Sequence, residues 1–125
     1  MNFKYNDGGG TVSDIATGLM WQKATAPGTY TWAQAISYCE NLTLGGHSDW
    51  RLPTIEELDS IVDYGRVDPA IDTDYFPDTG ASFYWSSTTY AYNTDYAWSM
   101  NFIGDGNYNY KHFYNYVRAV RGEQC

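Results

Sequence analysis

Few side chains in this sequence could support catalysis. Only two histidines occur, His47 and His112, and neither stands in a recognisable serine or cysteine nucleophile motif. The sequence also lacks a glycine-rich phosphate loop and the His-Glu-x-x-His pattern of zinc proteases. The adjacent carboxylates Glu56 and Glu57 could act as an acid–base pair, but a solvated helix face is the simpler explanation on an acidic chain. We therefore expect no enzymatic activity.

Four aspartates in one loop raise the question of a bound calcium ion; they are Asp68, Asp72, Asp74 and Asp78. Calcium prefers several carboxylate oxygens, but the loop lacks the glycine and the terminal glutamate of an EF-hand. The alternative is a set of turn residues that keep the loop soluble, and this is the reading we favour. We expect no other cofactor.

The segment Tyr90–Tyr116 carries the most distinctive chemistry of the chain. Fifteen of its 27 residues are Tyr, Asn, Asp or His. A protein core does not need this composition, because every buried phenol and carboxamide would require a partner, whereas Ala97, Trp98 and Met100 already supply apolar positions. We therefore expect the polar aromatic side chains to face outward. Tyrosines with short polar residues are typical of recognition surfaces such as antibody paratopes, and a solvated face without a partner is the alternative.

The same four residue types share a genetic regularity. Codons for Asn, Tyr, His and Asp differ only in their first base, so repeated first-base substitution of Asn codons would leave this set. Selection for binding would also favour Tyr and Asn, so the codon pattern is suggestive only.

Length and charge limit the classes of partner. The chain has 125 residues, enough for one domain, 1–125, and too few for two. Its 7 Lys and Arg against 15 Asp and Glu give a net charge of −8, which repels nucleic acid and anionic lipid. No stretch approaches the roughly 20 apolar residues that span a bilayer. We expect a soluble chain that binds no nucleic acid and does not insert into membranes.

Two helices are predicted in the first half. Thr31 and Gln34 form a capping box, so a helix begins at Trp32, and its apolar face continues until Gly45-Gly46. Thr54 and Glu57 form a second box, followed by an apolar stripe that ends before Gly65.

Strands are predicted mainly in the second half. A short strand is expected over 18–22, a long loop over 68–79, and three strands within 83–87, 96–102 and 116–121. Gly104–Gly106 is expected to be a turn between the last two strands, with partly irregular structure over 107–114. The prediction is an α+β fold in which two helices pack on an antiparallel sheet with long loops.

Two cysteines, Cys39 and Cys125, permit one intramolecular disulfide. A buried free thiol at Cys39 and an exposed Cys125 in the tail form the alternative, and the sequence does not decide between them.

Several motifs together resemble one known family. They are Gly18–Gln22, Thr31–Ala35, Tyr38–Leu42, Gly45–Leu58, Tyr84–Ser87 and Val117–Gly122. This set resembles the C-terminal domain of Legionella collagen-like proteins over nearly the whole chain, and the run Trp50–Thr54 is especially specific. The resemblance implies a C-type-lectin-like fold, related to that of formylglycine-generating enzymes.

The same fold is used by the variable proteins of diversity-generating retroelements, in which mutated Asn codons create a ligand-binding surface. The resemblance implies a scaffold held by Trp21, Trp50, Arg51, Trp85 and Arg118. It also implies a variable surface drawn from Tyr90, Tyr92, Asn93, Asp95, Tyr96, Asn107, Tyr108, Asn109, Tyr110, His112, Tyr114 and Asn115. We expect a protein or other surface ligand, with carbohydrate as an alternative, and a place on a cell or virion surface.

The chain also departs from the family pattern. Ala119 stands where the collagen-like family commonly has Cys, so Cys39 lacks its usual partner and Cys125 is the substitute available. The Glu-Pro-Asn and Gln-Pro-Asp triplets of calcium-dependent lectins are absent, as is a cysteine pair matching that of formylglycine-generating enzymes. The first rival function is a fixed polysaccharide-binding adhesin, which the shortage of basic residues disfavours. The second, which we favour less, is an oxidase of the formylglycine-generating type.

Overall fold

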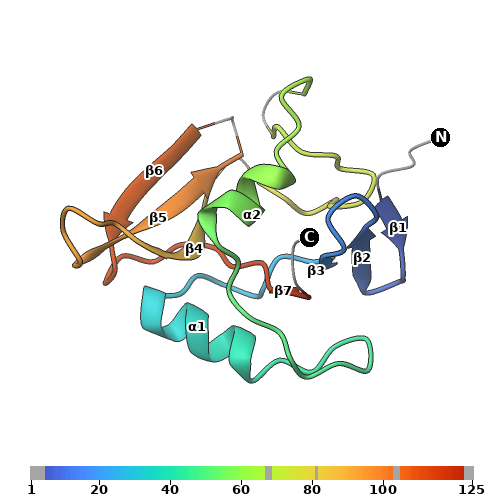
Figure 1. Cartoon of the computed structure of the whole chain (residues 1–125), viewed down its shortest axis with the longest axis horizontal. Coiled ribbons are helices and arrows are strands. Elements are labelled where there is room, and N and C mark those ends of the chain that lie inside the picture. The colour runs from blue at the N-terminus through green and yellow to red at the C-terminus, as the bar shows by residue number, and fades with distance from the viewer. Residues whose placement is uncertain (1–4, 67–68, 81, 103–104, 123–125) are drawn as a thin grey trace.

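The computed structural model describes residues 5–66, 69–80, 82–102 and 105–122, which form two helices and two antiparallel sheets. The elements in chain order are β1 (Tyr5–Asp7), β2 (Thr11–Asp14), β3 (Met20–Gln22), α1 (Trp32–Glu40), α2 (Ile55–Ser60), β4 (Phe83–Thr89), β5 (Tyr96–Asn101), β6 (Asp105–Tyr110) and β7 (Val120–Arg121). The sheets lie toward opposite ends of the molecule (Figure 1). The predicted α+β class is confirmed, and neither described helix is long and apolar enough to cross a membrane.

The first sheet joins the two ends of the described chain. Its strand order is β1-β2-β3-β7, and Trp21 of β3 pairs with Val120 of β7. The strand predicted over 116–121 is therefore wrong in extent and in partner. The backbone groups before Val120 bond to three different segments. Tyr116 O accepts from Trp85 N of β4, Val117 O accepts from Ala26 N of a loop, and Ala119 O accepts from Gln22 N at the end of β3.

The second sheet has the order β4-β5-β6 and positions the candidate site. Its strand β6 occupies the segment predicted to be a turn followed by irregular structure. Asn and Gly have low strand propensity, which hid the period-two alternation that brings Tyr108 and Tyr110 onto one face.

Both helices begin where the capping boxes predict. Thr31 Oγ1 accepts from Gln34 N at 3.4 Å, and Thr54 Oγ1 accepts from Glu57 N at 3.2 Å, with the reciprocal glutamine and glutamate contacts also formed. Both helices end earlier than predicted. The Asn41 side chain donates to Ser37 O at 2.9 Å, satisfying a carbonyl of the last turn of α1.

Buried side chains from both sheets and both helices form two apolar clusters. One contains Trp21, Leu58, Tyr84, Met100 and Phe102, and the other contains Ala35, Cys39, Trp50, Trp85, Ala97 and Val117. The expected scaffold residues Trp21, Trp50, Trp85 and Arg118 are all buried. The remaining one, Arg51, forms two hydrogen bonds of 2.7 Å with the carboxylate of Glu57.

The Arg118 guanidinium is fully buried and holds several loops together. It donates to the carbonyls of Gln22 and Lys23, and to Thr79 Oγ1 at 2.7 Å. Its carbon lies 4.8 Å from the centre of the Phe76 ring. Burial lowers the pKa of this guanidinium, and the hydrogen bonds offset part of the cost of desolvating the charge.

Candidate ligand-binding face

The register of the β4–β6 sheet gathers aromatic side chains on one face. Tyr96 pairs with Tyr110, and Trp98 pairs with Tyr108, so alternation along both strands directs these four rings to the same side. Tyr90 follows β4 and is fixed beside them by the hydrogen bond from its N–H to Tyr96 O at 2.9 Å. The opposite face of β5 is buried at Ala97 and Ser99.

These rings are in continuous contact. Tyr90 and Tyr108 stack with centroids 4.2 Å apart and an interplanar angle of 13°, and Tyr96 and Tyr110 lie 4.1 Å apart. Trp98 meets Tyr108 edge to face at 5.6 Å, and Tyr92 lies 5.6 Å from Tyr90. We define the aromatic face as the set Tyr90, Tyr92, Tyr96, Trp98, Tyr108 and Tyr110.

The aromatic face is open to solvent. The exposed fraction is 90% for Tyr92, 42% for Tyr108 and 39% for Tyr110. Toward its other end, the same side of the sheet is covered, because Tyr84 and Met100 join the cluster that contains Leu58 of α2. The exposed rings therefore lie beside the covered part of the sheet and on the side opposite to the buried Ala97 and Ser99.

The surroundings raise the pKa of two phenols of the aromatic face, those of Tyr90 and Tyr96. Hydrogen bonding with Tyr110, together with desolvation, raises the pKa of Tyr96 to about 12. Desolvation and the neighbouring Tyr108 phenol raise the pKa of Tyr90. Both groups are therefore neutral hydroxyls near neutral pH, and such hydroxyls can donate and accept hydrogen bonds.

The predicted asparagines of β6 lie on the other side of the strand. Asn109 Oδ1 accepts from the buried Ser99 Oγ at 2.7 Å, and Asn115 Nδ2 lies 3.5 Å from the same oxygen. Asn107 Oδ1 accepts from Tyr108 N at 2.8 Å. These three predicted residues therefore support the backbone beneath the aromatic face rather than joining it.

The other predicted residues lie around the margin or apart. Asn93 and Asp95 form the exposed turn between β4 and β5, where Asn93 Oδ1 accepts from Asp95 N at 3.1 Å. The His112 ring extends the face, with its centroid 5.1 Å from that of Tyr110. Tyr114 lies apart and lines a separate hollow with Phe83.

Comparison with known proteins agrees with this scaffold. The family model of the Lcl C-terminal domain matches residues 10–121, nearly the whole chain. The chain belongs to this family. A comparison with curated proteins finds no match. The matched range of this Lcl domain includes every strand from β2 onward, both helices and every residue of the aromatic face.

Two aromatic residues of the Lcl domain were missed by the sequence analysis. Trp98 was assigned to the core, but it is only half-buried and contacts Tyr90 and Tyr108. Its period-two spacing from Tyr96 was the available signal. Phe113 is 47% exposed and its ring lies 5.6 Å from that of Tyr110.

The basic residues of the second half are already engaged. Arg118 is buried, and Arg121 makes two hydrogen bonds with the Asp49 carboxylate, at 2.6 and 3.0 Å. Lys111 Nζ lies 4.0 Å from the centre of the Trp32 ring and donates to Thr89 Oγ1. Among the described residues, these contacts leave no cluster of basic side chains beside the aromatic face.

The acidic loop does not converge on one point within the described residues. Asp72 accepts from Asp74 N and faces Arg66 at 3.4 Å, whereas Asp78 accepts from Thr25 N. Asp68 lies outside the described residues. Across the described ranges, no group of three His, Cys, Asp or Glu side chains could hold a metal ion.

Cys39 and Glu57 are both buried, and their surroundings shift their pKa values in opposite directions. Cys39 is a fully buried free thiol, and burial raises its pKa to about 12. Its proposed partner, Cys125, lies outside the described residues. Burial opposes ionisation of Glu57, but hydrogen bonds from Arg51 and Thr54 outweigh it and lower the pKa of that carboxyl.

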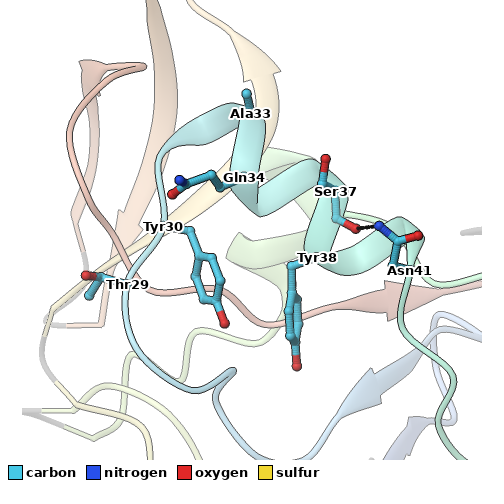
Figure 2. A pocket seen from close by; sticks show the side chains of 7 residues that line it. All are labelled: Thr29, Tyr30, Ala33, Gln34, Ser37, Tyr38 and Asn41. Atoms are coloured by element: carbon cyan, nitrogen blue, oxygen red, sulfur yellow. Dashed lines mark hydrogen bonds between the residues drawn. The ribbon is translucent and has the colours of Figure 1, made fainter.

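A larger hollow lies over α1, away from the aromatic face. It has a volume of about 570 Å³ and is lined by Tyr30, Tyr38 and polar residues of the helix (Figure 2). Both phenols are already engaged, because Tyr30 Oη donates to Pro27 O and Tyr38 Oη accepts from Gln22 Nε2 at 2.8 Å. None of the residues that line this hollow is a carboxylate, histidine, lysine or cysteine.

Proposed function

We propose that this Lcl domain is a non-catalytic ligand-binding domain and that the aromatic face is its binding surface. The observation that carries the proposal is a continuous set of six aromatic rings, of which Tyr92, Tyr108 and Tyr110 are exposed, on a sheet whose opposite face is buried at Ala97 and Ser99. A soluble domain gains no core stability from rings left in water, so an exposed aromatic patch is best explained by a partner.

The geometry supports recognition at low entropic cost. Tyr90, Tyr96 and Tyr108 hold one another by ring contacts, so little side-chain freedom remains to be lost on binding. Tyrosine gives a large contact area with a polar tip, and truncating a central aromatic residue of an interface costs about 2 kcal/mol or more. A few such rings suffice for micromolar affinity.

We also propose that the scaffold is C-type-lectin-like and that the surface is diversified by a retroelement. Support comes from the family membership. It also comes from the concentration of Tyr, Asn, His and Asp, whose codons differ only in their first base, in the segment that carries the rings. The structure divides these positions by role. Substitutions at Tyr92 or Tyr110 would alter the exposed surface, whereas Asn109 is tied to Ser99 and has less freedom to change.

The charge distribution favours a protein ligand over an acidic polysaccharide. The net charge is −8, and Lys111 and Arg121 are held by Trp32 and Asp49. Electrostatic attraction to a polyanion needs a free basic patch.

Two experiments test these proposals. Sequencing the gene across its source population should show changes confined to adenine positions of codons between Tyr90 and Tyr116; scattered or absent variation would contradict diversification. Binding of the labelled domain to arrays of surface proteins and of glycans should give protein signals. Signals only from sulfated glycans would instead support a fixed adhesin.

A further inference from the structure

Strand β6 is the outer strand of its sheet, and no described strand pairs with its outer edge (Figure 1). Lys111 N donates to Asp95 O at 2.9 Å, which marks residues 95 and 111 as a hydrogen-bonded pair of the antiparallel ladder. Because such pairs alternate, Asn107 and Asn109 bond to β5. The backbone groups of Gly106, Tyr108 and Tyr110 therefore point away from the sheet.

Two contacts confirm this direction. Tyr108 N donates to the side chain of its neighbour Asn107, and Tyr110 O accepts from Phe113 N at 3.0 Å. The described contacts leave four outward groups for a partner: Gly106 N–H, Gly106 C=O, Tyr108 C=O and Tyr110 N–H. Unpaired strand edges of this kind can bind an extended segment as an additional strand.

An acidic hollow adjoins this edge on the side of the sheet that carries the aromatic face. It has a volume of about 340 Å³ and is lined by Ile55, Glu56, Asp59, Tyr64, Met100 and Gly106. Met100 pairs with Gly106 and lies two residues beyond Trp98, on the same side of β5. Glu56 and Asp59 are exposed, and Tyr64 Oη donates to Asp59 Oδ1 at 2.7 Å.

We propose that the β6 edge binds an extended peptide segment carrying Lys or Arg, which adds to the sheet as a fourth strand. This inference rests on the proposed function of the aromatic face and names its ligand class. Alternate side chains of the added strand would lie beside Tyr108 and Tyr110, where a cation meets the ring faces, and would reach the carboxylates of Glu56 and Asp59. A second copy of the chain fits poorly, because both copies would bring a charge of −8 and their own acidic hollows to the junction.

A backbone substitution separates strand addition from binding by side chains. Gly106→Pro removes one outward N–H and keeps the bonds to β5, and proline is tolerated at such an edge position. Gly106→Ala keeps the N–H and is the matched control, because an added Cβ would meet its nearest atom, Ser99 O, at 3.9 Å. Gly106 also has no positive φ that would disfavour either residue.

The probes are peptides selected from a random 12-residue displayed library on the immobilised domain. We expect enrichment of Lys- and Arg-containing peptides, at least tenfold weaker binding to Gly106→Pro, and binding within twofold to Gly106→Ala. Amide hydrogen exchange at Gly106 and Tyr110 should slow at least tenfold on binding. Peptides methylated at alternate backbone nitrogens should lose affinity for the unchanged domain, which keeps the test valid if Gly106→Pro does not fold.

Other outcomes overturn the inference in distinguishable ways. Peptides that require the Tyr108 ring but bind Gly106→Pro normally would leave the aromatic face as the site and refute strand addition. Peptides that require the Gly106 N–H but not the Tyr108 ring would refute the proposed role of the face. Enrichment of acidic peptides, or no enrichment, would refute the ligand class. A dimer in sedimentation that is lost in Gly106→Pro would assign the edge to a second copy.

Discussion

The buried Arg118 guanidinium allows a quantitative test of the scaffold. Replacing it by methionine keeps much of the side-chain volume but removes every donor. The carbonyls of Gln22 and Lys23 and the hydroxyl of Thr79 would then lose the donors that satisfy them. A buried polar group left without a partner costs about 1–3 kcal/mol, and removing one partner of a buried charged network costs about 3–5 kcal/mol.

We expect Arg118→Met to lower the free energy of unfolding by about 4 kcal/mol, after allowing for the relief of burying a charge. Typical domains have only about 5–15 kcal/mol of stability, so the variant should be close to unfolding. The assay is urea denaturation followed by fluorescence of the buried Trp21 and Trp85. The control is Arg121→Met, which removes an ion pair with the exposed Asp49 and should leave the midpoint nearly unchanged. A loss below about 1 kcal/mol for Arg118→Met would refute the assigned role of these hydrogen bonds.

Three further predictions concern ionisable groups. The folded-state pKa of Glu57 is lowered, so its contribution to stability is present above its unfolded pKa and is lost as pH falls through its folded pKa. Glu57→Gln should therefore make the urea midpoint depend less steeply on pH in the acid range. An unchanged pH dependence of the midpoint would contradict this. In a Cys125→Ser background, Cys39 should react with a thiol reagent at least a hundredfold more slowly in the native state than in urea, because it is buried with a pKa of about 12; rapid native labelling would show that the thiol is accessible. Absorbance titration should show a phenol ionising near pH 12 that disappears in Tyr96→Phe, and an unaltered curve would refute the raised pKa of Tyr96.

Local patterns in the sequence predicted the starts of the helices. The hydrogen bonds of a capping box join residues three positions apart, so Thr31 with Gln34 and Thr54 with Glu57 determine where a helix begins with little help from the rest of the chain. The ends depended on less distinctive residues. Helix α1 ends at the C-cap Asn41, whose side chain donates to Ser37 O, before the glycines Gly45 and Gly46 that were predicted to end it.

Long-range pairing was harder to predict. Nothing near Val120 indicates that it pairs with Trp21 at the other end of the chain, so the division into two sheets was missed. Composition predicted that the tyrosines face outward, and this is confirmed at Tyr108 and Tyr110. Composition did not predict that the tyrosines and the asparagines of β6 lie on opposite sides of the strand, because this depends on the register of β6 against β5.

The central claim is that the aromatic face binds a ligand, and paired substitution on a folded scaffold tests it most directly. The measurement gives two quantities for each protein: the dissociation constant for the best array ligand and the melting temperature. The proteins compared are the unchanged domain, the double variant Tyr108→Ala with Tyr110→Ala, and the control Ile15→Ala. Ile15 is 64% exposed and lies in the turn that connects β2 and β3 of the first sheet. The account predicts at least a 30-fold weaker affinity for the double variant, as loss of about 2 kcal/mol requires, with little change in melting temperature. Unchanged affinity, or a melting temperature that collapses because the rings hold the fold together, would contradict it.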